Sequence, residues 1–263
     1  MKVEGKVALI TGGASGMGKG FTESLLKAGA KVSVVDYNAE SGNATTEELK
    51  TKYGEDKVIF CQCNVTSQSD FEAAFKRTKD TFGGIDIVVN NAGIGGETDD
   101  MWEKVVDVNV KGTLRGTRLG MNYLSKDNGG NGGLIVNMSS AGGLNPNPFS
   151  PTYGCTKAGI IHATRCYAIS PAAVQSNIRL MVMCPAFVDT PLFKNLAAGD
   201  STQTIGASPE QITAFIQHIG VLTIEEVSNI FMEMVEDDTK TGLILTCAKN
   251  TGTKYGTLVL QAP

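Results

Sequence analysis

Short runs of consecutive apolar residues, rich in Val and Ile, recur along the chain and alternate with longer stretches whose apolar positions follow helical spacing. Consecutive apolar positions are typical of parallel strands covered on both faces, and this alternation is the pattern of βα units around a sheet. The runs predict seven strands, at residues 7–11, 32–36, 58–63, 85–90, 134–138, 178–183 and 243–247. The stretches between them predict six helices, at residues 17–28, 40–53, 67–82, 101–124, 152–173 and 224–235.

The predicted elements fit the α/β class. No Pro-rich linker divides the chain, and the Gly-rich run at 128–133 has the composition of a turn that enters the fifth strand. A length of 263 residues lies within the range of one large domain. We therefore expect a single doubly wound domain over residues 1–263, with a seven-stranded, mainly parallel sheet and helices on both faces.

The alternation lapses between residues 187 and 220, where 34 residues stand in place of a short connection. Loops of that length in compact domains are usually functional. The segment holds many large apolar residues and few charges, a pattern that fits either a lid over a hydrophobic substrate or an amphipathic helix packed on the core. We expect a substrate-lid insertion at about 187–220.

Composition and charge exclude several classes of protein. A hydrophobic fraction of 41% and a charged fraction of 19% exclude a disordered or fibrous chain. A net charge of −4 without a basic stripe predicts no nucleic-acid partner. No apolar run approaches the ~18 residues of a membrane span, and the apolar run 7–10 near the N-terminus is too short for a signal peptide. A cytoplasmic location is the expectation.

The cysteines contain no Cys-x-x-Cys pair, and only His162 and His218 could complete a metal site. We therefore expect reduced thiols that pack as small hydrophobic groups, and no bound metal. The six cysteines are Cys61, Cys63, Cys155, Cys166, Cys184 and Cys247.

Glycine is over-represented, at 31 of 263 residues, against a usual ~7%. The run 11–20 (Thr-Gly-Gly-Ala-Ser-Gly-Met-Gly-Lys-Gly) follows the first predicted strand and opens a helix, where backbone N–H groups can bind phosphate. Residues 13–19 also fit the triphosphate loop Gly-x4-Gly-Lys, but Gly20 stands where that loop needs Ser or Thr for magnesium. The mismatch favours a Rossmann-type dinucleotide site.

A dinucleotide site predicts an acidic residue at the end of the second strand. Asp36 is at that strand end, 18 residues after Gly18. Its carboxylate can accept hydrogen bonds from a ribose diol and would repel a 2′-phosphate. Because neither Ser15 nor Tyr37 supplies a neighbouring cation, the sequence predicts NAD rather than NADP.

Tyr153 and Lys157 are spaced i and i+4, on one face of a predicted helix, and Ser140 closes the fifth strand 13 residues before the tyrosine. Open α/β sheets bind ligands at the carboxyl ends of their strands, so the three side chains can converge there. Lowering the pKa of a phenol by two to three units takes roughly 3–4 kcal/mol. One cation ~4 Å away at an effective ε of ~20 supplies about 4 kcal/mol. The ammonium of Lys157 could therefore lower the pKa of the Tyr153 phenol enough for it to act as a base.

With residues 90–93 (Asn-Asn-Ala-Gly) after the fourth strand and with Asn109, these motifs resemble the short-chain dehydrogenase/reductase family over essentially the whole chain. The resemblance implies four catalytic roles. Tyr153 would act as general acid and base, and Lys157 would bind the nicotinamide ribose. Ser140 would orient the substrate oxygen, and Asn109 would belong to a proton relay.

The resemblance also implies an NAD-binding set and a substrate-binding set. The cofactor-binding residues are Gly12, Ser15, Gly16, Met17, Gly18, Asp36, Tyr37, Cys63, Asn64, Val65, Asn91, Ala92, Gly93, Tyr153, Lys157, Val188 and Thr190. The substrate-binding residues are Ser140, Ser150 and Phe187. Two positions depart from the family pattern, because Asn64 replaces an adenine-facing acid and Ala186 replaces the Gly of a Pro-Gly pair.

Within the family, the chain resembles the NAD-dependent 15-hydroxyprostaglandin dehydrogenases and, beside them, the insect-type alcohol dehydrogenases, at 5–9, 125–130, 137–140 and 236–238. This implies hydride transfer between NAD and a secondary alcohol or ketone of a hydrophobic, lipid-like substrate. The prostaglandin enzymes have Gln where this chain has Ser150. Short-chain, terpenoid and steroid alcohols therefore stay open as alternatives.

The resemblance further implies a homodimer or homotetramer. In the family, the helix that carries Trp102 and Asn109 packs against a second subunit, so Trp102 fits an interface as well as a core. A catalytically silent dinucleotide-binding sensor would need only the glycine loop and Asp36. The presence of Asn109, Ser140, Tyr153 and Lys157 favours an enzyme over such a sensor.

Overall fold

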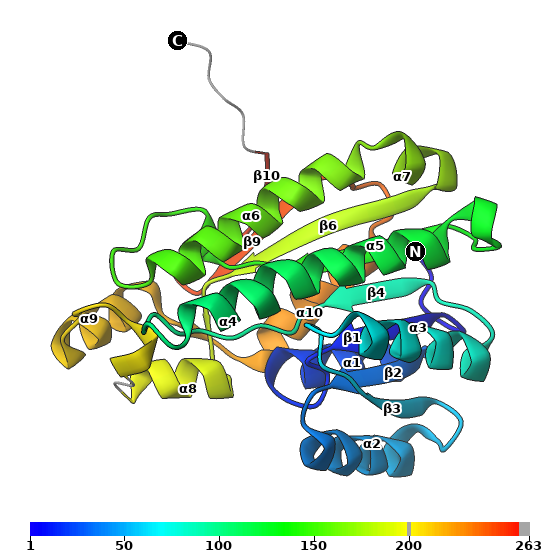
Figure 1. Cartoon of the computed structure of the whole chain (residues 1–263), viewed down its shortest axis with the longest axis horizontal. Helices are drawn as coiled ribbons and strands as arrows, with labels where there is room; N and C mark the ends of the chain where they lie inside the picture. Colours follow the sequence, from blue (N-terminus) through cyan, green and yellow to red (C-terminus); the bar gives the residue numbers. More distant parts are fainter. Residues whose placement is uncertain (199–200, 258–263) are drawn as a thin grey trace.

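An eight-stranded sheet forms the centre of the molecule (Figure 1). The computed structural model describes residues 1–198 and 201–257. Seven strands run parallel in the order β9-β6-β5-β4-β1-β2-β3, and β10 pairs with β9 in the antiparallel sense. The strands are β1 (Val7–Thr11), β2 (Lys31–Asp36), β3 (Val58–Gln62), β4 (Ile87–Asn90), β5 (Gly133–Met138), β6 (Ile178–Pro185), β9 (Ile244–Ala248) and β10 (Gly252–Gly256). The predicted α/β fold with a mainly parallel sheet is confirmed.

The predicted number of seven strands is wrong by one, because β10 adds a strand at the edge of the sheet. All residues of β10 are exposed, so no apolar alternation marks it in the sequence. The strand follows a tight turn in which Gly252 has a φ of +72°, a conformation that favours glycine. Backbone pairing with β9 therefore holds β10 in place without burial.

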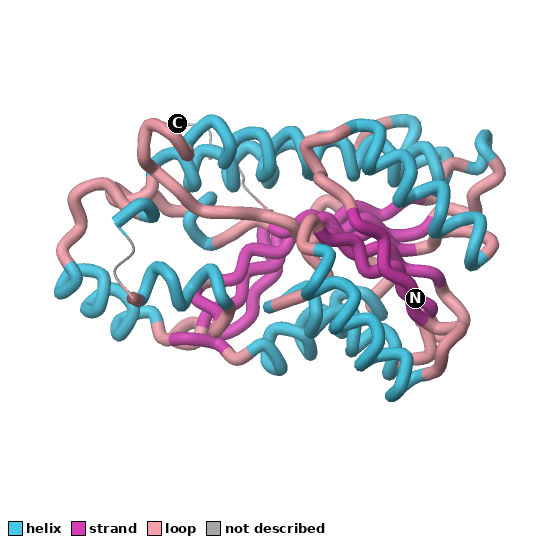
Figure 2. The backbone as a smooth tube through the Cα atoms, turned by 60° about the horizontal axis from the view of Figure 1, so that its bottom comes forward, coloured by secondary structure: helices cyan, strands magenta, loops and turns pink. Residues whose placement is uncertain are grey.

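Two layers of helices cover the sheet, which is seen nearly edge-on in Figure 2. Helices α1 (Gly16–Lys27), α2 (Ala39–Tyr53) and α10 (Ile224–Glu236) pack on one face, and α3 (Gln68–Phe82), α5 (Thr113–Leu124) and α6 (Pro151–Ala168) on the other. Alternate residues of one strand point into different cores: Ala8 and Ile10 of β1 join the first layer, and Leu9 joins the second. This two-sided burial explains why consecutive positions in the central strands are apolar.

Two of the predicted helices are subdivided. The stretch expected at 101–124 begins as α4 (Trp102–Val106), widens into a π-helical segment (Asp107–Gly112) and continues as α5. The stretch expected at 152–173 ends at Ala168, and the Ser170 hydroxyl caps a short helix α7 (Pro171–Ser176). The Ser-Pro pair at that point is a helix-start signal that corrects the prediction of one continuous helix.

The insertion at 187–220 is built from regular elements. Strand β7 (Phe187–Val188) begins it and pairs with β8 (Val221–Leu222), so a small parallel sheet closes its base. Helices α8 (Pro191–Ala197) and α9 (Pro209–Ile219) lie between these strands and project at one end of the molecule (Figure 1). Residues 199–200 of the predicted lid lie outside the described residues.

All six cysteines carry free thiols. Within residues 1–198 and 201–257, no group of three or more His, Cys, Asp or Glu side chains is placed to hold a metal ion. In the same residues, no helix combines the length and the apolar character that crossing a bilayer requires. His218, on α9, is exposed, as is Trp102, 44% of whose surface is accessible.

Candidate active site

The glycine loop folds tightly between β1 and α1. Gly12 and Gly16 have φ values of +62° and +52°, which favour glycine, and a Cβ on Gly18 would lie 2.0 Å from the carbonyl oxygen of Gly12. Ser15 is the N-cap of α1, but its side chain makes no capping hydrogen bond, and the first turn carries no acidic residue. The helix therefore presents backbone N–H groups with no side-chain acceptor, an arrangement that fits a dinucleotide phosphate.

Asp36 lies beside this loop, at the end of β2. Its Oδ2 accepts a hydrogen bond from Ala14 N at 3.1 Å, and its Oδ1 accepts one from Asn38 N at 3.0 Å. An ionised carboxylate has about four acceptor positions, so it can still accept from a ribose diol. Tyr37 follows with 72% of its surface exposed. The predicted ribose-binding acid thus occupies the expected strand end and also braces the loop.

The residues predicted for the adenine face lie after β3. The Oδ1 of Asn64 accepts hydrogen bonds from Thr66 N at 3.0 Å and from Thr66 Oγ1 at 2.8 Å. Cys63 and Val65 are buried, and burial raises the pKa of the Cys63 thiol to about 12. Because the Asn64 oxygen is already paired twice, its NH2 group is the part of the side chain left for an adenine ring. The side chain of Cys63 packs in the core, so only its backbone could face a ligand.

Asn91 and Ala92 tie the end of β4 to the end of β1. Asn91 Nδ2 donates to the carbonyl oxygens of Thr11 and Gly12 at 3.0 and 3.2 Å. The Thr11 hydroxyl oxygen accepts from Asn91 N and from Ala92 N, both at 3.0 Å. Thr11 thus braces the loop, a role that no sequence motif predicts. These bonds fix the glycine loop against the centre of the sheet.

Lys157 is buried at the carboxyl ends of the central strands. Its ammonium donates to the carbonyl oxygen of Met138, the last residue of β5, at 3.0 Å. Burial lowers the pKa of Lys157 to about 8. Cys184 lies nearby, but burial raises the pKa of its thiol to about 12, so at neutral pH it is uncharged and does not pair with the ammonium. Lys157 is therefore a buried cation held by a neutral carbonyl.

Tyr153 and Ser140 stand next to this cation. The Lys157 Nζ atom is 5.4 Å from the centre of the Tyr153 ring. Burial raises the pKa of the Tyr153 phenol, and a hydrogen bond with the Ser140 side chain acts in the opposite direction. The Ser140 hydroxyl also accepts from Gly142 N at 3.1 Å. The structure thus brings together three of the four predicted catalytic side chains.

Asn109, the fourth, lies in the π-helical segment and is fully buried. Its side-chain amide makes two hydrogen bonds with the backbone of Ile94, each 2.9 Å long, and donates to Thr156 Oγ1 at 3.2 Å. A Cβ on Gly93 would lie 3.3 Å from both the Asn109 Oδ1 and the Lys157 Nζ atoms. Gly93 thus leaves the space in which these two groups face each other, while the Asn109 side chain itself is engaged in holding the 93–94 loop.

The predicted substrate-binding residues lie at the base of the insertion. The Phe187 ring packs against Phe193 of α8 and Phe215 of α9, with ring centres 5.5 and 5.6 Å apart. Ser150 Oγ donates to the carbonyl oxygen of Gln203 at 3.2 Å. The aromatic cluster therefore links β7 to both helices of the insertion, whereas Ser150 contacts its main chain.

Val188 and Thr190 follow Phe187. Val188 is buried, and the Thr190 hydroxyl accepts from Phe193 N as the N-cap of α8. A Cβ on Gly16 would lie 3.4 Å from Thr190 Cγ2, so the base of the insertion touches the glycine loop. These contacts bring the two predicted halves of the cofactor site together.

Glu97 also belongs to this region, although no sequence motif marks it. Its carboxylate accepts hydrogen bonds from the backbone N–H groups of Thr152 and Tyr153 at 3.1 and 2.9 Å. It therefore caps α6, the helix that carries Tyr153 and Lys157, from a distant loop. A residue so far from the helix in sequence gives no local capping signal.

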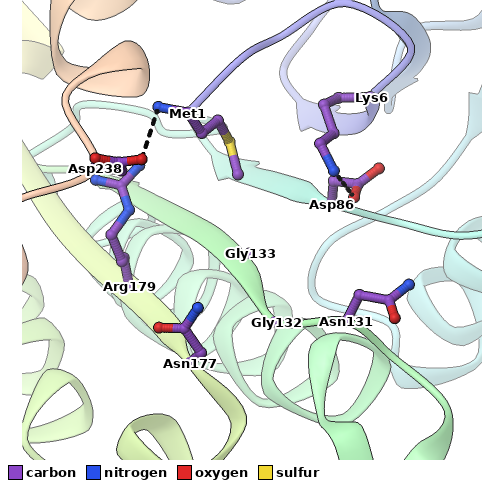
Figure 3. A pocket seen from close by; sticks show the side chains of 9 residues that line it. All are labelled: Met1, Lys6, Asp86, Asn131, Gly132, Gly133, Asn177, Arg179 and Asp238. Atoms are coloured by element: carbon purple, nitrogen blue, oxygen red, sulfur yellow. Dashed lines mark hydrogen bonds and ion pairs between the residues drawn. The ribbon is translucent and has the colours of Figure 1, made fainter.

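A cavity of about 240 Å³ lies at the amino ends of the strands, opposite the end that carries the predicted catalytic residues (Figure 3). Its charges pair among themselves: Lys6 Nζ is 2.9 Å from Asp86 Oδ1, and the amino group of Met1 is 3.9 Å from Asp238. The Arg179 guanidinium donates to three backbone carbonyls. None of the predicted catalytic residues lines this cavity, so the candidate chemistry is at the carboxyl ends of the strands.

Comparison with known proteins agrees with this geometry. The profile of the short chain dehydrogenase family matches residues 6–201. The 15-hydroxyprostaglandin dehydrogenase (NAD+) of Mus musculus is 39% identical over 268 aligned positions, which cover 100% of this chain and 99% of that protein. The 3beta-hydroxysteroid dehydrogenase 2 of Eggerthella lenta is 34% identical over 229 positions, or 80% of this chain and 85% of that protein.

A solved structure is similar in fold as well. The 3-ketoacyl-(acyl-carrier-protein) reductase from Brucella melitensis, crystallised with NADH, superposes with a TM-score of 0.79 and is 28% identical in sequence. The superposition covers 93% of this chain and 97% of that chain.

Proposed function

The chain belongs to the short-chain dehydrogenase family, and we propose that it oxidises a secondary hydroxyl group of a hydrophobic, lipid-like molecule with NAD, or reduces the corresponding ketone. The family is one of oxidoreductases, and relatives that use NAD(+) match the full length of the chain. The observation that carries the proposal is the buried Lys157 ammonium beside the Tyr153 ring and the Ser140 hydroxyl.

NAD is the cofactor, as the NAD(+) relatives and the NADH-bound neighbour indicate. The glycine loop would hold its pyrophosphate and Asp36 its adenosine ribose, because the loop leaves no room for side chains and Asp36 lies beside it. When bound, NAD supplies the hydride acceptor for the carbinol carbon and a positively charged ring. The chain's own residues must then handle the hydroxyl proton.

Tyr153 takes that proton at its phenol oxygen, and it returns the proton when a ketone is reduced. Burial raises the pKa of Tyr153, so its ionisation depends on nearby positive charge. Two unit charges about 5 Å apart at an effective ε of ~20 interact with about 3 kcal/mol, which is worth about two pKa units. The Lys157 ammonium, together with the positively charged ring of the bound cofactor, would therefore stabilise the phenolate, and Ser140 would hold the substrate oxygen in line.

The apolar character of the insertion supports a hydrophobic substrate. Phe187, Phe193 and Phe215 form one aromatic cluster, and Phe215 and Ile205 remain 42% and 53% exposed. Pockets lined by such side chains bind apolar molecules. Steroid alcohols are the alternative that a relative of known activity favours. A silent sensor is disfavoured, because Tyr153 and Ser140 lie together beside the buried Lys157, an arrangement that dinucleotide binding alone does not require.

A screen of alcohols tests the proposed function. The purified protein and NAD are incubated with prostaglandins, fatty alcohols, terpenoid alcohols, hydroxysteroids and short secondary alcohols, and NADH fluorescence is followed. We expect the highest kcat/KM for a lipid-like secondary alcohol. A preference for short alcohols would contradict the lipid assignment, and no turnover of any alcohol, with NADH still bound tightly, would favour the sensor.

Asp36→Ala tests whether Asp36 binds the adenosine ribose of NAD. We expect the Kd for NADH to rise about tenfold to hundredfold, since charge-assisted hydrogen bonds contribute ~1.5–3 kcal/mol each. The Kd for NADH divided by the Kd for NADPH, both measured by fluorescence titration, should rise, because NADPH is no longer repelled by the carboxylate. Asp36→Asn is the matched control, because it keeps one acceptor and removes the charge. An unchanged ratio of the two Kd values in both variants would show that Asp36 does not distinguish the ribose of NADH from that of NADPH.

A further inference from the structure

Glu97 joins the amino end of the catalytic helix α6 to the insertion. We propose that Glu97 is a positioning residue that fixes Tyr153 when the segment 201–205 of the insertion is docked. The kinetic part of the proposal rests on the proposed function, whereas its geometric part rests on contacts that hold whatever the substrate is.

The amino end of α6 is capped in an unusual way. Ser150 occupies the N-cap position, but its side chain makes no hydrogen bond to the first turn of the helix. The two oxygens of Glu97 do so instead, one with Thr152 N at 3.1 Å and one with Tyr153 N at 2.9 Å. A carboxylate in this place satisfies two N–H groups and complements the helix dipole. Because Tyr153 is one of the two donors, Glu97 holds its backbone directly.

The backbone of Glu97 meets the insertion. Glu97 N donates to the carbonyl oxygen of Thr202 at 2.7 Å. Two further bonds dock the same segment beside it: Ser150 Oγ donates to the Gln203 carbonyl at 3.2 Å, and Ile205 N donates to the Phe149 carbonyl at 2.8 Å. The loop that holds the amino end of α6 is thus itself held by the docked segment. A change in docking is transmitted through Glu97 to the position of Tyr153.

Glu97→Ala removes both capping bonds and leaves the backbone of residue 97 in place. Hydrogen exchange followed by mass spectrometry should show about tenfold faster exchange at the Thr152 and Tyr153 amides, which corresponds to about 1.4 kcal/mol. The rate of hydrogen exchange in the segment 201–205 should also rise in this variant. With the best alcohol of the screen, kcat should fall about tenfold while the Kd for NADH changes by less than about twofold.

Two further variants separate positioning from general stability. Glu97→Gln keeps one side-chain oxygen as an acceptor, so it should restore kcat to within about threefold of the unsubstituted protein. Glu103→Ala, which changes an exposed glutamate of α4, is the matched control and should alter neither exchange nor kcat. Rescue by glutamine is a result that simple loss of a surface charge would not give.

Several outcomes would overturn the proposal. Unchanged exchange at both α6 amides, or unchanged kcat in Glu97→Ala, would show that Glu97 does not position Tyr153. Faster exchange throughout α6 with weaker NADH binding would assign Glu97 a general role in folding instead. The exchange measurement needs no substrate, so failure of the proposed function, seen as no turnover by the unsubstituted protein, is distinguishable from failure of this link.

Discussion

Tyr153→Phe is expected to lower kcat for alcohol oxidation by roughly 10³-fold, a loss within the usual contribution of a general acid–base group. The substitution removes the oxygen proposed to take the substrate proton and leaves the ring in place beside Lys157. NADH binding should be preserved, because the glycine loop and Asp36 are untouched. Stopped-flow fluorescence with NAD and the preferred alcohol measures the rate, and titration with NADH measures the Kd.

Tyr167→Phe is the matched control for this variant, because it makes the same change towards the other end of α6. It should leave kcat within about twofold of the unsubstituted protein. If Tyr153→Phe kept a comparable kcat, another group would have to be the acid–base residue, and the role of Lys157 would lose its basis as well.

Lys157→Met is expected to have two large effects of opposite kind. It should lower kcat by roughly 10²-fold or more, because the phenolate of Tyr153 loses about 3 kcal/mol of stabilisation. It should also stabilise the ligand-free protein at neutral pH, because a buried ammonium is replaced by an apolar chain of similar length. Gain of stability with loss of activity is characteristic of a residue kept for function.

The pKa of Lys157 gives the size and the direction of the stability effect. Its folded pKa of about 8 lies below the unfolded value of 10.5, so between these pH values the unfolded state binds the proton and the folded state does not. The contribution of Lys157 to stability is therefore fully present above pH 10.5 and is lost as the pH falls through about 8. The difference amounts to roughly 3 kcal/mol.

Urea denaturation of both proteins at several pH values tests this expectation. The free energy of unfolding of Lys157→Met minus that of the unsubstituted protein should be largest near neutral pH and should shrink by roughly 3 kcal/mol towards pH 10.5. Lys126→Met, at an exposed lysine, should show no such pH dependence. A difference that stays constant with pH would contradict a depressed pKa for Lys157.

The central sheet could be predicted from the sequence because burial on both faces leaves a continuous apolar signal in each strand. Strand β10 gave no such signal, since it pairs with β9 through the backbone and all its residues are exposed. The break between α6 and α7 was marked by Ser170 and Pro171, but a helical pattern of apolar residues continues across it. A prediction based on apolar periodicity alone therefore misses a local helix-start signal of this kind.

The convergence of Ser140, Tyr153 and Lys157 could be predicted because all three follow from one spacing and one strand end. The role of Glu97 could not, because a cap supplied from a distant loop depends on tertiary structure. Nor could the sequence show that the buried Asn109 amide is engaged with the backbone of Ile94. Polar groups that satisfy one another across the fold carry no periodic signal.

Transfer of an isotope label tests hydride transfer most directly. The preferred secondary alcohol of the screen is prepared with deuterium on its carbinol carbon and incubated with NAD and the protein, and the reduced dinucleotide is analysed by mass spectrometry. We predict one deuterium in each molecule of NADH formed by the unsubstituted protein, and labelled NADH formed roughly 10³-fold more slowly by Tyr153→Phe. Unlabelled NADH, or labelled NADH formed at equal rates by both proteins, would contradict hydride transfer assisted by Tyr153.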